Sequence, residues 1–247
     1  AYASRLYATE DLDQLAAEAQ SYLDQGFTAM KMRFGYGPRD GLAGMRKNIE
    51  LVKTIRQVIG PDIELAGDAY MGWDVRYAIR MIKMLEDADL NLAWVEEPVI
   101  PDDIAGYAQI RAAVDTPISG GEHEFTRYGF RELITQKAVD IVQLDVNRVG
   151  GITEARKIWA LAAAYSLPVI PHAGQMHNYH LIMAHMNSPL AEYFPPPEGI
   201  PDGNELFWEL FIGEPRAEKG YITLPEVPGL GIEVNWDVVN AHLYKGN

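Results

Sequence analysis

The chain of 247 residues contains no cysteine, which excludes disulfide bridges and thiolate metal sites and leaves hard oxygen ligands for a metal. Basic residues are also scarce: 21 Lys and Arg stand against 35 Asp and Glu, a formal net charge of −14. Such an acidic chain is not expected to bind nucleic acid, whose phosphates need a basic surface. No apolar run approaches the length that crosses a membrane, so a membrane is not an expected partner either.

The residues that are present describe a folded globular protein, with 48% hydrophobic and 23% charged side chains. The length is that of one large barrel domain. The chain opens at Ala1 without an initiator Met, on a segment, residues 2–6, that already has the pattern of a strand. Targeting signals are therefore not observable in this sequence.

Short apolar strands alternate with amphipathic helices along the chain. Helices are predicted from about Thr9 to Gln25, with Thr9 as the cap, and over residues 75–86 and 153–165. Eight strands with helical crossovers predict an α/β fold with a parallel, TIM-type barrel over residues 1–193. From Phe194 onward, prolines and glycines predict an irregular C-terminal extension over residues 194–247.

Nearly every predicted strand ends in a residue that can take part in chemistry. Because the carboxyl ends of barrel strands meet on one face, we expect these side chains to share a site. Buried strands rarely tolerate such residues without partners. The residues are Lys31, Arg33, Asp68, Glu96, Glu122, Asp145, His172 and Glu192.

Three carboxylates on adjacent strands, Asp68, Glu96 and Glu122, are the predicted metal ligands. Their mutual repulsion would raise their pKa values unless a cation lay between them, and an oxygen cage without cysteine favours Mg²⁺. Glu124 is an alternative third ligand, because it lies two residues after Glu122 on the same face. Glu97 points to the opposite side of its strand and is interpreted as a supporting residue.

Asp145 and His172 end consecutive strands, so the carboxylate can hold one imidazole nitrogen and leave the other free to move a proton. Lys31 can hold a substrate carboxylate or neutralise negative charge that develops during a reaction. Arg33, on the same face, can bind an anion but cannot act as a base.

The order and spacing of several short motifs are more specific than any one of them. The motifs are Lys31-Met32-Arg33, Gly67-Asp68-Ala69, Val95-Glu96-Glu97-Pro98, Gly121-Glu122-His123-Glu124, residues 144–151, Pro171-His172 and Ala191-Glu192. With these motifs the chain resembles the enolase superfamily, and within it the mandelate racemase-like subgroup. Residues 121–131, 178–180 and 187–192 are also similar to the rhamnonate dehydratases, a group of acid-sugar dehydratases.

The resemblance implies a (β/α)7β barrel, Mg²⁺ on the three carboxylates named above, and an Asp145–His172 pair that acts as the base. It places Glu192 near the substrate carboxylate or the leaving oxygen. Tyr70 stands where relatives often have Asn, and His180 belongs to a resembling motif, so both are expected to contact substrate. Relatives also carry an N-terminal capping domain that selects the substrate, and the present chain shows none.

The function that follows as a hypothesis is a Mg²⁺-dependent acid-sugar dehydratase. It would abstract the C2 proton of an aldonate, with a rhamnonate-like substrate favoured, and eliminate the 3-hydroxyl to give a 2-keto-3-deoxy acid. The alternatives are a racemase or epimerase on the same scaffold, and a truncated metal-binding barrel without activity. We expect a cytoplasmic homo-oligomer, because barrels of this family commonly assemble.

Overall fold

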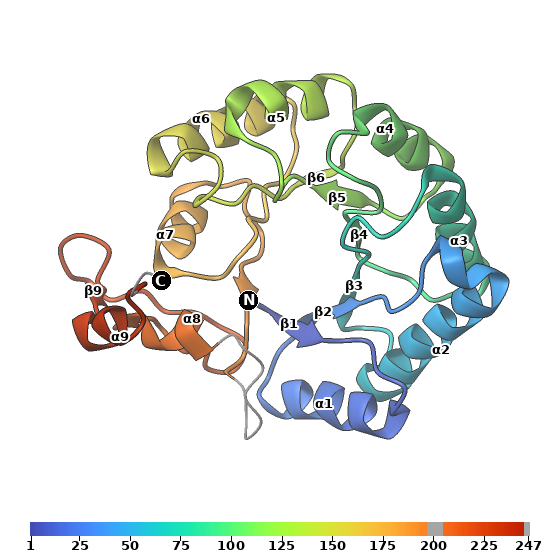
Figure 1. The fold of residues 1–247 in the computed structure, drawn as a ribbon, viewed down its shortest axis with the longest axis horizontal. Coiled ribbons are helices and arrows are strands. Elements are labelled where there is room, and N and C mark those ends of the chain that lie inside the picture. The colour runs from blue at the N-terminus through green and yellow to red at the C-terminus, as the bar shows by residue number, and fades with distance from the viewer. Residues whose placement is uncertain (197–204, 245–247) are drawn as a thin grey trace.

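In the computed structural model, which describes residues 1–196 and 205–244, strands and helices alternate around a ring (Figure 1). Helices lie outside the strands, and the two ends of the barrel sequence meet where β1 and β7 pair. The elements of the ring are β1 (Tyr2–Leu6), α1 (Leu12–Asp24), β2 (Ala29–Arg33), the 3-10 helix η1 (Pro38–Asp40), α2 (Gly41–Ile59), β3 (Glu64–Asp68), α3 (Val75–Asp87), β4 (Val95–Glu96), α4 (Ile104–Ala113), β5 (Ile118–Gly120), α5 (Thr126–Thr135), β6 (Ile141–Val142), α6 (Ile152–Ala164), α7 (Met176–Ala184) and β7 (Glu192–Tyr193).

Seven strands form one parallel sheet in the order β6-β5-β4-β3-β2-β1-β7. A parallel bridge from Val142 to Val169 extends the sheet by one more position beyond β6. The curled sheet with helices on its outer side confirms the predicted TIM-type barrel.

The strand boundaries differ in part from those predicted. Strands β3 and β4 end at Asp68 and Glu96 as expected. The strands expected to end at Glu122 and Asp145 are shorter, because the chain leaves the sheet at Gly120 and Val142. The strand expected before His172 is reduced to the bridge at Val169, and Glu192 begins β7 and does not end it.

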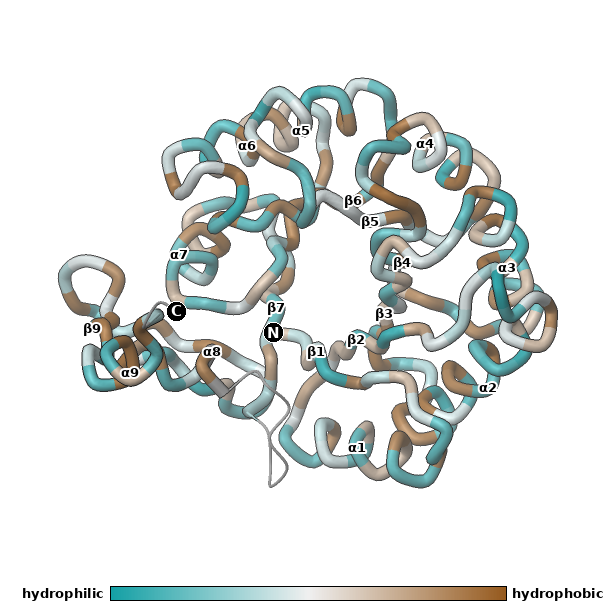
Figure 2. Tube along the Cα trace, viewed as in Figure 1, coloured by the Kyte–Doolittle hydropathy of each residue, from teal (hydrophilic) through white to brown (hydrophobic). Residues whose placement is uncertain are grey.

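The predicted helices are present, with small shifts at their ends. Helix α3 spans Val75–Asp87 and α6 spans Ile152–Ala164. The predicted cap of the first helix was wrong: Asp11 caps α1 by accepting a hydrogen bond from the amide of Gln14. Figure 2 shows polar and apolar residues alternating along the helices of the ring, as expected when one side of each helix packs on the sheet.

The period-two alternation of the strands divides the barrel interior into two levels. The lower level is an apolar cluster to which six strands or strand-like segments each give one buried residue. Two positions further along the same strands, the inward residues are polar or charged. This second level contains several of the residues that were predicted to form the site. The apolar residues are Tyr2, Ala29, Ala66, Trp94, Ile141 and Ile170, and the polar ones are Ser4, Lys31, Asp68, Glu96, Gln143 and His172.

The C-terminal extension contains α8 (Glu205–Glu209), β8 (Phe211–Ile212), β9 (Glu233–Val234) and α9 (Trp236–Ala241), with β8 and β9 paired antiparallel. It lies beside the ring in Figure 1. The amino group of Ala1 donates to the carbonyl of Gly220 at 2.7 Å, and the ring of Trp208 packs edge-on against Tyr193. The boundary between barrel and extension at residue 194 stays a prediction.

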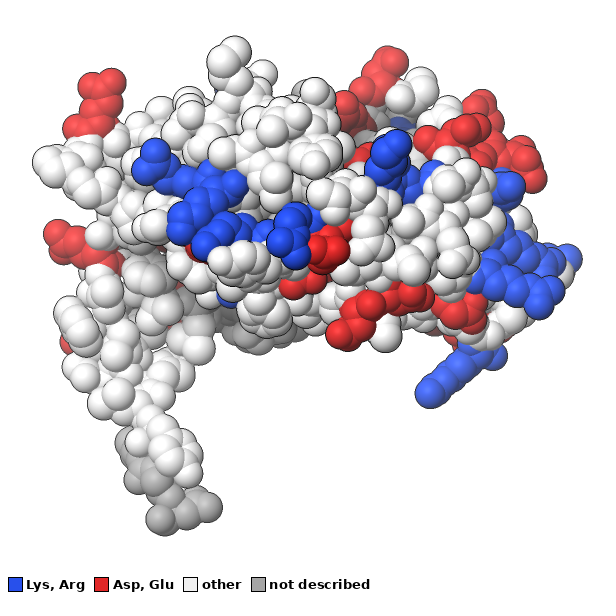
Figure 3. Space-filling view, turned by 90° about the horizontal axis from the view of Figure 1, so that it is seen from above, with Lys and Arg blue, Asp and Glu red and all other residues white. Residues whose placement is uncertain are grey.

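Two surface properties bear on the expected partners. On the face drawn in Figure 3, Lys and Arg side chains are interspersed with Asp and Glu, so that face lacks a continuous basic surface. Among residues 1–196 and 205–244, no helix is both long enough and apolar enough to cross a bilayer.

Candidate active site

A buried lysine lies at the centre of the polar level. Lys31 on β2 is only 5% exposed, and its Nζ lies 2.5 Å from Oε1 of Glu96 and 2.8 Å from Oε1 of Glu192. It is also 3.9 Å from Oδ2 of Asp68. The sheet register explains this arrangement, because Asp68 pairs with Glu96 across β3 and β4, while Tyr2 pairs with Glu192 across β1 and β7. The pairing of β7 with β1, which itself pairs with β2, therefore brings residue 192 to residue 31.

The remaining oxygens of the two glutamates are held by neighbouring donors. Oε2 of Glu96 accepts from Nε2 of Gln143 at 2.7 Å and from the indole Nε1 of Trp94 at 3.2 Å. Glu192 accepts from the hydroxyl of Ser4 at 2.6 Å and from the amide of Ala173 at 2.7 Å. These bonds fix both carboxylates in place, since each is 1% exposed.

One ammonium cannot neutralise all of the carboxylates that face it. Burial by itself raises the pKa of Glu192. The positive charges of Lys31 and His172 lower it by a larger amount, so the resulting pKa is about 2. Burial raises the pKa of Glu96, and Lys31 lowers it. The negative charges of Asp68 and Glu192 raise it again, so the resulting pKa is about 7. Burial lowers the pKa of Lys31, yet Glu192 and Glu96 raise it well above its ordinary value. Lys31 is therefore charged, but its single positive charge is smaller than the negative charge of the carboxylates around it.

His172 and Asp145 form the predicted pair. Nδ1 of His172 lies 3.0 Å from Oδ2 of Asp145, and Nε2 lies 3.4 Å from Oε2 of Glu122. Burial lowers the pKa of His172, but the hydrogen bond to Asp145 and the charges of Glu192 and Glu122 raise it to about 9. The imidazole therefore has one nitrogen held by a carboxylate and the other directed toward the acidic cluster, as a group that moves a proton requires.

Arg33 and Asp68 form a second contact between adjacent strands. Nη2 of Arg33 lies 3.2 Å from Oδ2 of Asp68, which follows from their direct pairing across β2 and β3. The guanidinium also lies between two aromatic rings, 5.3 Å from the ring centre of Tyr7 and 4.7 Å from that of Tyr70. Tyr70 is 45% exposed, so its ring is accessible from solvent at the edge of the site.

The donor set fits a divalent cation held by oxygen. Oε1 of Glu97 is buried and has no hydrogen-bond partner among the residues that the structure describes, and Oδ2 of Asp68 is approached by Arg33 in an ion pair but makes no hydrogen bond of good geometry there. Glu97, Glu122 and His123 also offer ligand atoms that lie within 4.8 Å of one another. Burial and the neighbouring carboxylates raise the pKa values of Glu96 and Glu97, a cation would stabilise the ionised forms of both, and Mg²⁺ prefers carboxylate oxygens as ligands.

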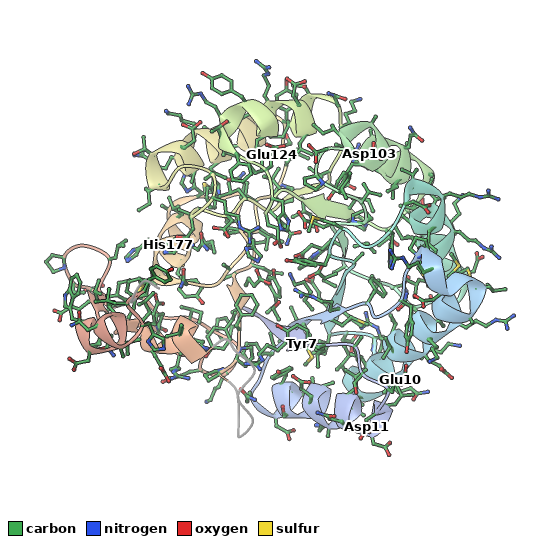
Figure 4. The ribbon with its side chains drawn as sticks, in the orientation of Figure 1. Tyr7, Glu10, Asp11, Asp103, Glu124 and His177 are labelled. Atoms are coloured by element: carbon green, nitrogen blue, oxygen red, sulfur yellow. The ribbon has the colours of Figure 1, made fainter. Side chains whose placement is uncertain are left out.

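Two of the residues selected from the sequence are not brought to the cluster. Oε1 of Glu124 accepts a hydrogen bond from the amide of Phe125, and Figure 4 places Glu124 beside α5. Nε2 of His180 lies 3.0 Å from the carbonyl of Leu230 in the extension, so a substrate contact by His180 would have to use its Nδ1.

Other residues reach the site without having been selected from the sequence. Nη1 of Arg148 lies 3.3 Å from Oε1 of Glu122, and its Nε lies 3.5 Å from Oδ2 of Asp145. Gln143 and Ser4 bind the two central glutamates. The period-two rule could have found Gln143 and Ser4, because each lies two residues from an inward-facing neighbour. Arg148 lies in a loop, where no such rule applies.

Residues 14–238 match the family described as Enolase C-terminal domain-like. The chain belongs to this family, whose barrel the fold and the acidic cluster had already indicated. The chain is 38% identical over 234 residues to the L-rhamnonate dehydratase of Saccharopolyspora erythraea. That match includes 94% of this chain and 58% of the relative, so the chain spans less than two thirds of the relative's length.

Solved structures also match this chain over nearly its whole length. The rhamnonate dehydratase of Gibberella zeae complexed with Mg matches with a TM-score of 0.82 and 36% identity, over 97% of this chain and 57% of the other. The 3,6-anhydro-D-galactonate cycloisomerase of Zobellia galactanivorans matches with a TM-score of 0.84 and 31% identity, over 98% of this chain and 66% of the other. Similar barrels thus carry different reactions, and the reaction must be argued from the site.

The raised carboxyl pKa values predict how stability depends on pH in protein treated with EDTA. Burial, with Glu122 and Glu96, raises the pKa of Glu97 to about 8, while that of Glu96 is about 7. Folded protein then keeps protons that unfolded chains have lost above about pH 4.5, so the free energy of unfolding should fall as pH rises from 5 to 8. The raised pKa of Glu96 alone corresponds to a decrease of about 3 kcal/mol in the free energy of unfolding over this pH range. Urea unfolding at several pH values measures this slope.

The matched measurement adds Mg²⁺ at each pH. A bound cation favours the ionised carboxylates, so the slope should flatten and the protein should gain stability with increasing Mg²⁺ concentration. A slope that is the same with Mg²⁺ and with EDTA would contradict a cation site among these carboxylates.

Proposed function

We propose that this barrel is the catalytic domain of a Mg²⁺-dependent acid-sugar dehydratase that acts on an aldonate, with a rhamnonate-like substrate favoured. The observation that carries the proposal is the imidazole of His172, held by Asp145 at Nδ1 and directed by Nε2 toward the carboxylate cluster. The similarity to rhamnonate dehydratases supports the same reaction class.

Asp68, Glu96 and Glu122 would hold the metal ion. When bound, Mg²⁺ supplies a Lewis acid that stabilises negative charge on the substrate carboxylate. The ammonium of Lys31, buried between Glu96 and Glu192, would add positive charge on the same side. Arg33 would bind a substrate oxygen, and the ring of Tyr70 would lie against the substrate.

Nε2 of His172 would take the C2 proton of the sugar acid, and Asp145 would stabilise the imidazolium that forms. The electron pair of the C2–H bond becomes the C2–C3 double bond as the C3–O bond breaks. The imidazolium returns its proton to the departing 3-hydroxyl, which leaves as water. Glu192 would orient the leaving oxygen, and the resulting enol becomes the 2-keto-3-deoxy acid.

A racemase needs a second base on the opposite face of C2. Burial lowers the pKa of Arg33, but Asp68 raises it above its ordinary value, so this guanidinium stays charged and cannot accept a proton. Arg33 therefore cannot serve as the second base of a racemase.

The expected homo-oligomer stays a prediction.

The test is a screen of the purified protein against a panel of aldonic acids, with Mg²⁺ and with EDTA, scoring 2-keto acid formation. We expect one acid, of L-rhamnonate type, to be converted only with Mg²⁺. Inversion at C2 with deuterium uptake from D2O and no 2-keto acid would instead support a racemase. Conversion of no acid would support a barrel that binds metal without catalysis.

A further inference from the structure

The site contains a second carboxylate–imidazole pair that the proposed mechanism does not use. Nδ1 of His123, in the loop after β5, lies 2.7 Å from Oε2 of Glu97, which directly follows β4. The side chain of Glu97 is 1% exposed, whereas that of His123 is 22% exposed. A buried carboxylate thus holds a partly exposed ring, the same arrangement as Asp145 and His172.

The backbone holds Glu97 in a conformation that few residues with a side chain adopt. Its φ angle is +40°, in the left-handed region, which costs free energy for a residue other than glycine. Two hydrogen bonds maintain it: its amide donates to the carbonyl of Ser119, and its carbonyl accepts from the amide of Met71. Such strain is retained where the surrounding structure fixes a side chain in one place.

The ring of His123 is held on two further sides. Its Nδ1 lies 3.6 Å from Oε1 of Glu122, and its plane meets that of Tyr70 edge-on with the ring centres 5.7 Å apart. Because His172 approaches the other oxygen of Glu122, the two imidazoles lie on either side of one carboxylate. No hydrogen bond of Nε2 of His123 is found within residues 1–196 and 205–244.

We propose that His123 is a second substrate-contacting residue, whose Nε2 hydrogen-bonds a hydroxyl of the sugar acid, and that Glu97 is its positioning residue. This inference rests on the proposed function. With Nδ1 held by Glu97, the ring presents one nitrogen in a fixed direction, and a hydroxyl can pair with it as donor or acceptor. Because the two imidazoles approach different oxygens of Glu122, His123 would bind a hydroxyl other than the one that leaves from C3 beside His172. His123 therefore contributes to the choice of sugar acid.

The test uses matched replacements of His123 in the His172→Asn protein, which we expect to bind the substrate and to convert it slowly enough for affinity to be measured. The amide nitrogen of Asn can replace Nδ1 of His123 in the contact with Glu97, but Asn has no atom at the position of Nε2. The longer Gln side chain can place its amide nitrogen near the position of Nε2. We expect His123→Asn to weaken binding of L-rhamnonate with Mg²⁺ by about tenfold to hundredfold, because a buried hydrogen bond is lost. We expect His123→Gln to restore part of the affinity.

Two further measurements separate substrate contact from a structural role. Mg²⁺ affinity, measured by calorimetry without the acid, should stay within about threefold of the parent protein. As a control, His242→Asn at the exposed residue that follows α9 should bind the acid normally. In the active protein, His123→Asn should lose discrimination against one deoxy analogue of the acid while keeping it against the others.

Binding of L-rhamnonate by His123→Asn as tightly as by the parent would overturn the inference and leave the proposed function intact. An affinity loss that disappears once the Mg²⁺ site is saturated would overturn it too, because the effect would then act through the metal. If the parent protein binds and converts no acid of the panel, the proposed function fails, and the inference fails with it.

Discussion

Replacing His172 with Asn is expected to lower kcat/KM for the sugar acid by about 10²–10⁴-fold. Asn can keep a hydrogen bond to Asp145 but cannot take the C2 proton, so the carboxylate cluster stays intact while the base is lost. Steady-state assays of 2-keto acid formation measure the effect. The rate of exchange of the C2 proton with D2O should fall by a similar factor, because the same nitrogen removes that proton.

The control for this substitution is His185→Asn. The ring of His185 stacks on Trp159 outside the site, and its Nδ1 is bonded to the carbonyl of Leu181, so activity should change little. Mg²⁺ affinity should be nearly equal in the two variants. An His172→Asn protein that retains C2 exchange at the wild-type rate would contradict the assignment of the base.

Replacing Lys31 with Met is expected to lower the free energy of unfolding by about 3–5 kcal/mol in the presence of EDTA. The shape of the side chain is largely kept, but Glu96, Glu192 and Asp68 lose the cation that lies between them. Buried carboxylates without a partner are costly. Urea unfolding at neutral pH measures the loss, which should become smaller when Mg²⁺ is added, because the cation neutralises part of the same cluster.

The matched control is Lys157→Met on α6. Lys157 is half-exposed, and its ion pair with Glu154 lies at the surface, where such pairs contribute about 0–1 kcal/mol. If Lys31→Met costs no more than this control, Lys31 does not stabilise the carboxylate cluster.

The barrel could be predicted because its signals are local. The alternation of short apolar strands with amphipathic helices depends on neighbouring residues, as in β3 with α3, and both elements are found where they were expected. The lengths of the later strands could not be predicted in the same way. Hydrogen bonding to the adjacent strand decides where a strand ends, and the segment around Val169 makes only a bridge.

The inward-facing residues were determined largely by the sequence, since the period of two puts Asp68 and Glu96 on the same side as the apolar residues two positions before them. The tertiary structure decided which of these residues touch. Pairing of β1 with β7 brings Glu192 to Lys31 across 161 positions of the chain, and no local pattern encodes that distance.

The loops were decided by the tertiary structure alone. The sequence placed Glu97 on the far side of its strand, as a supporting residue, but its contact with His123 depends on a left-handed backbone and on the path of the loop after β5. The same holds for Arg148, which reaches Glu122 from a different loop. Strand periodicity fixes the direction of a side chain only while the strand lasts, and beyond it the packing of neighbouring loops determines the contacts.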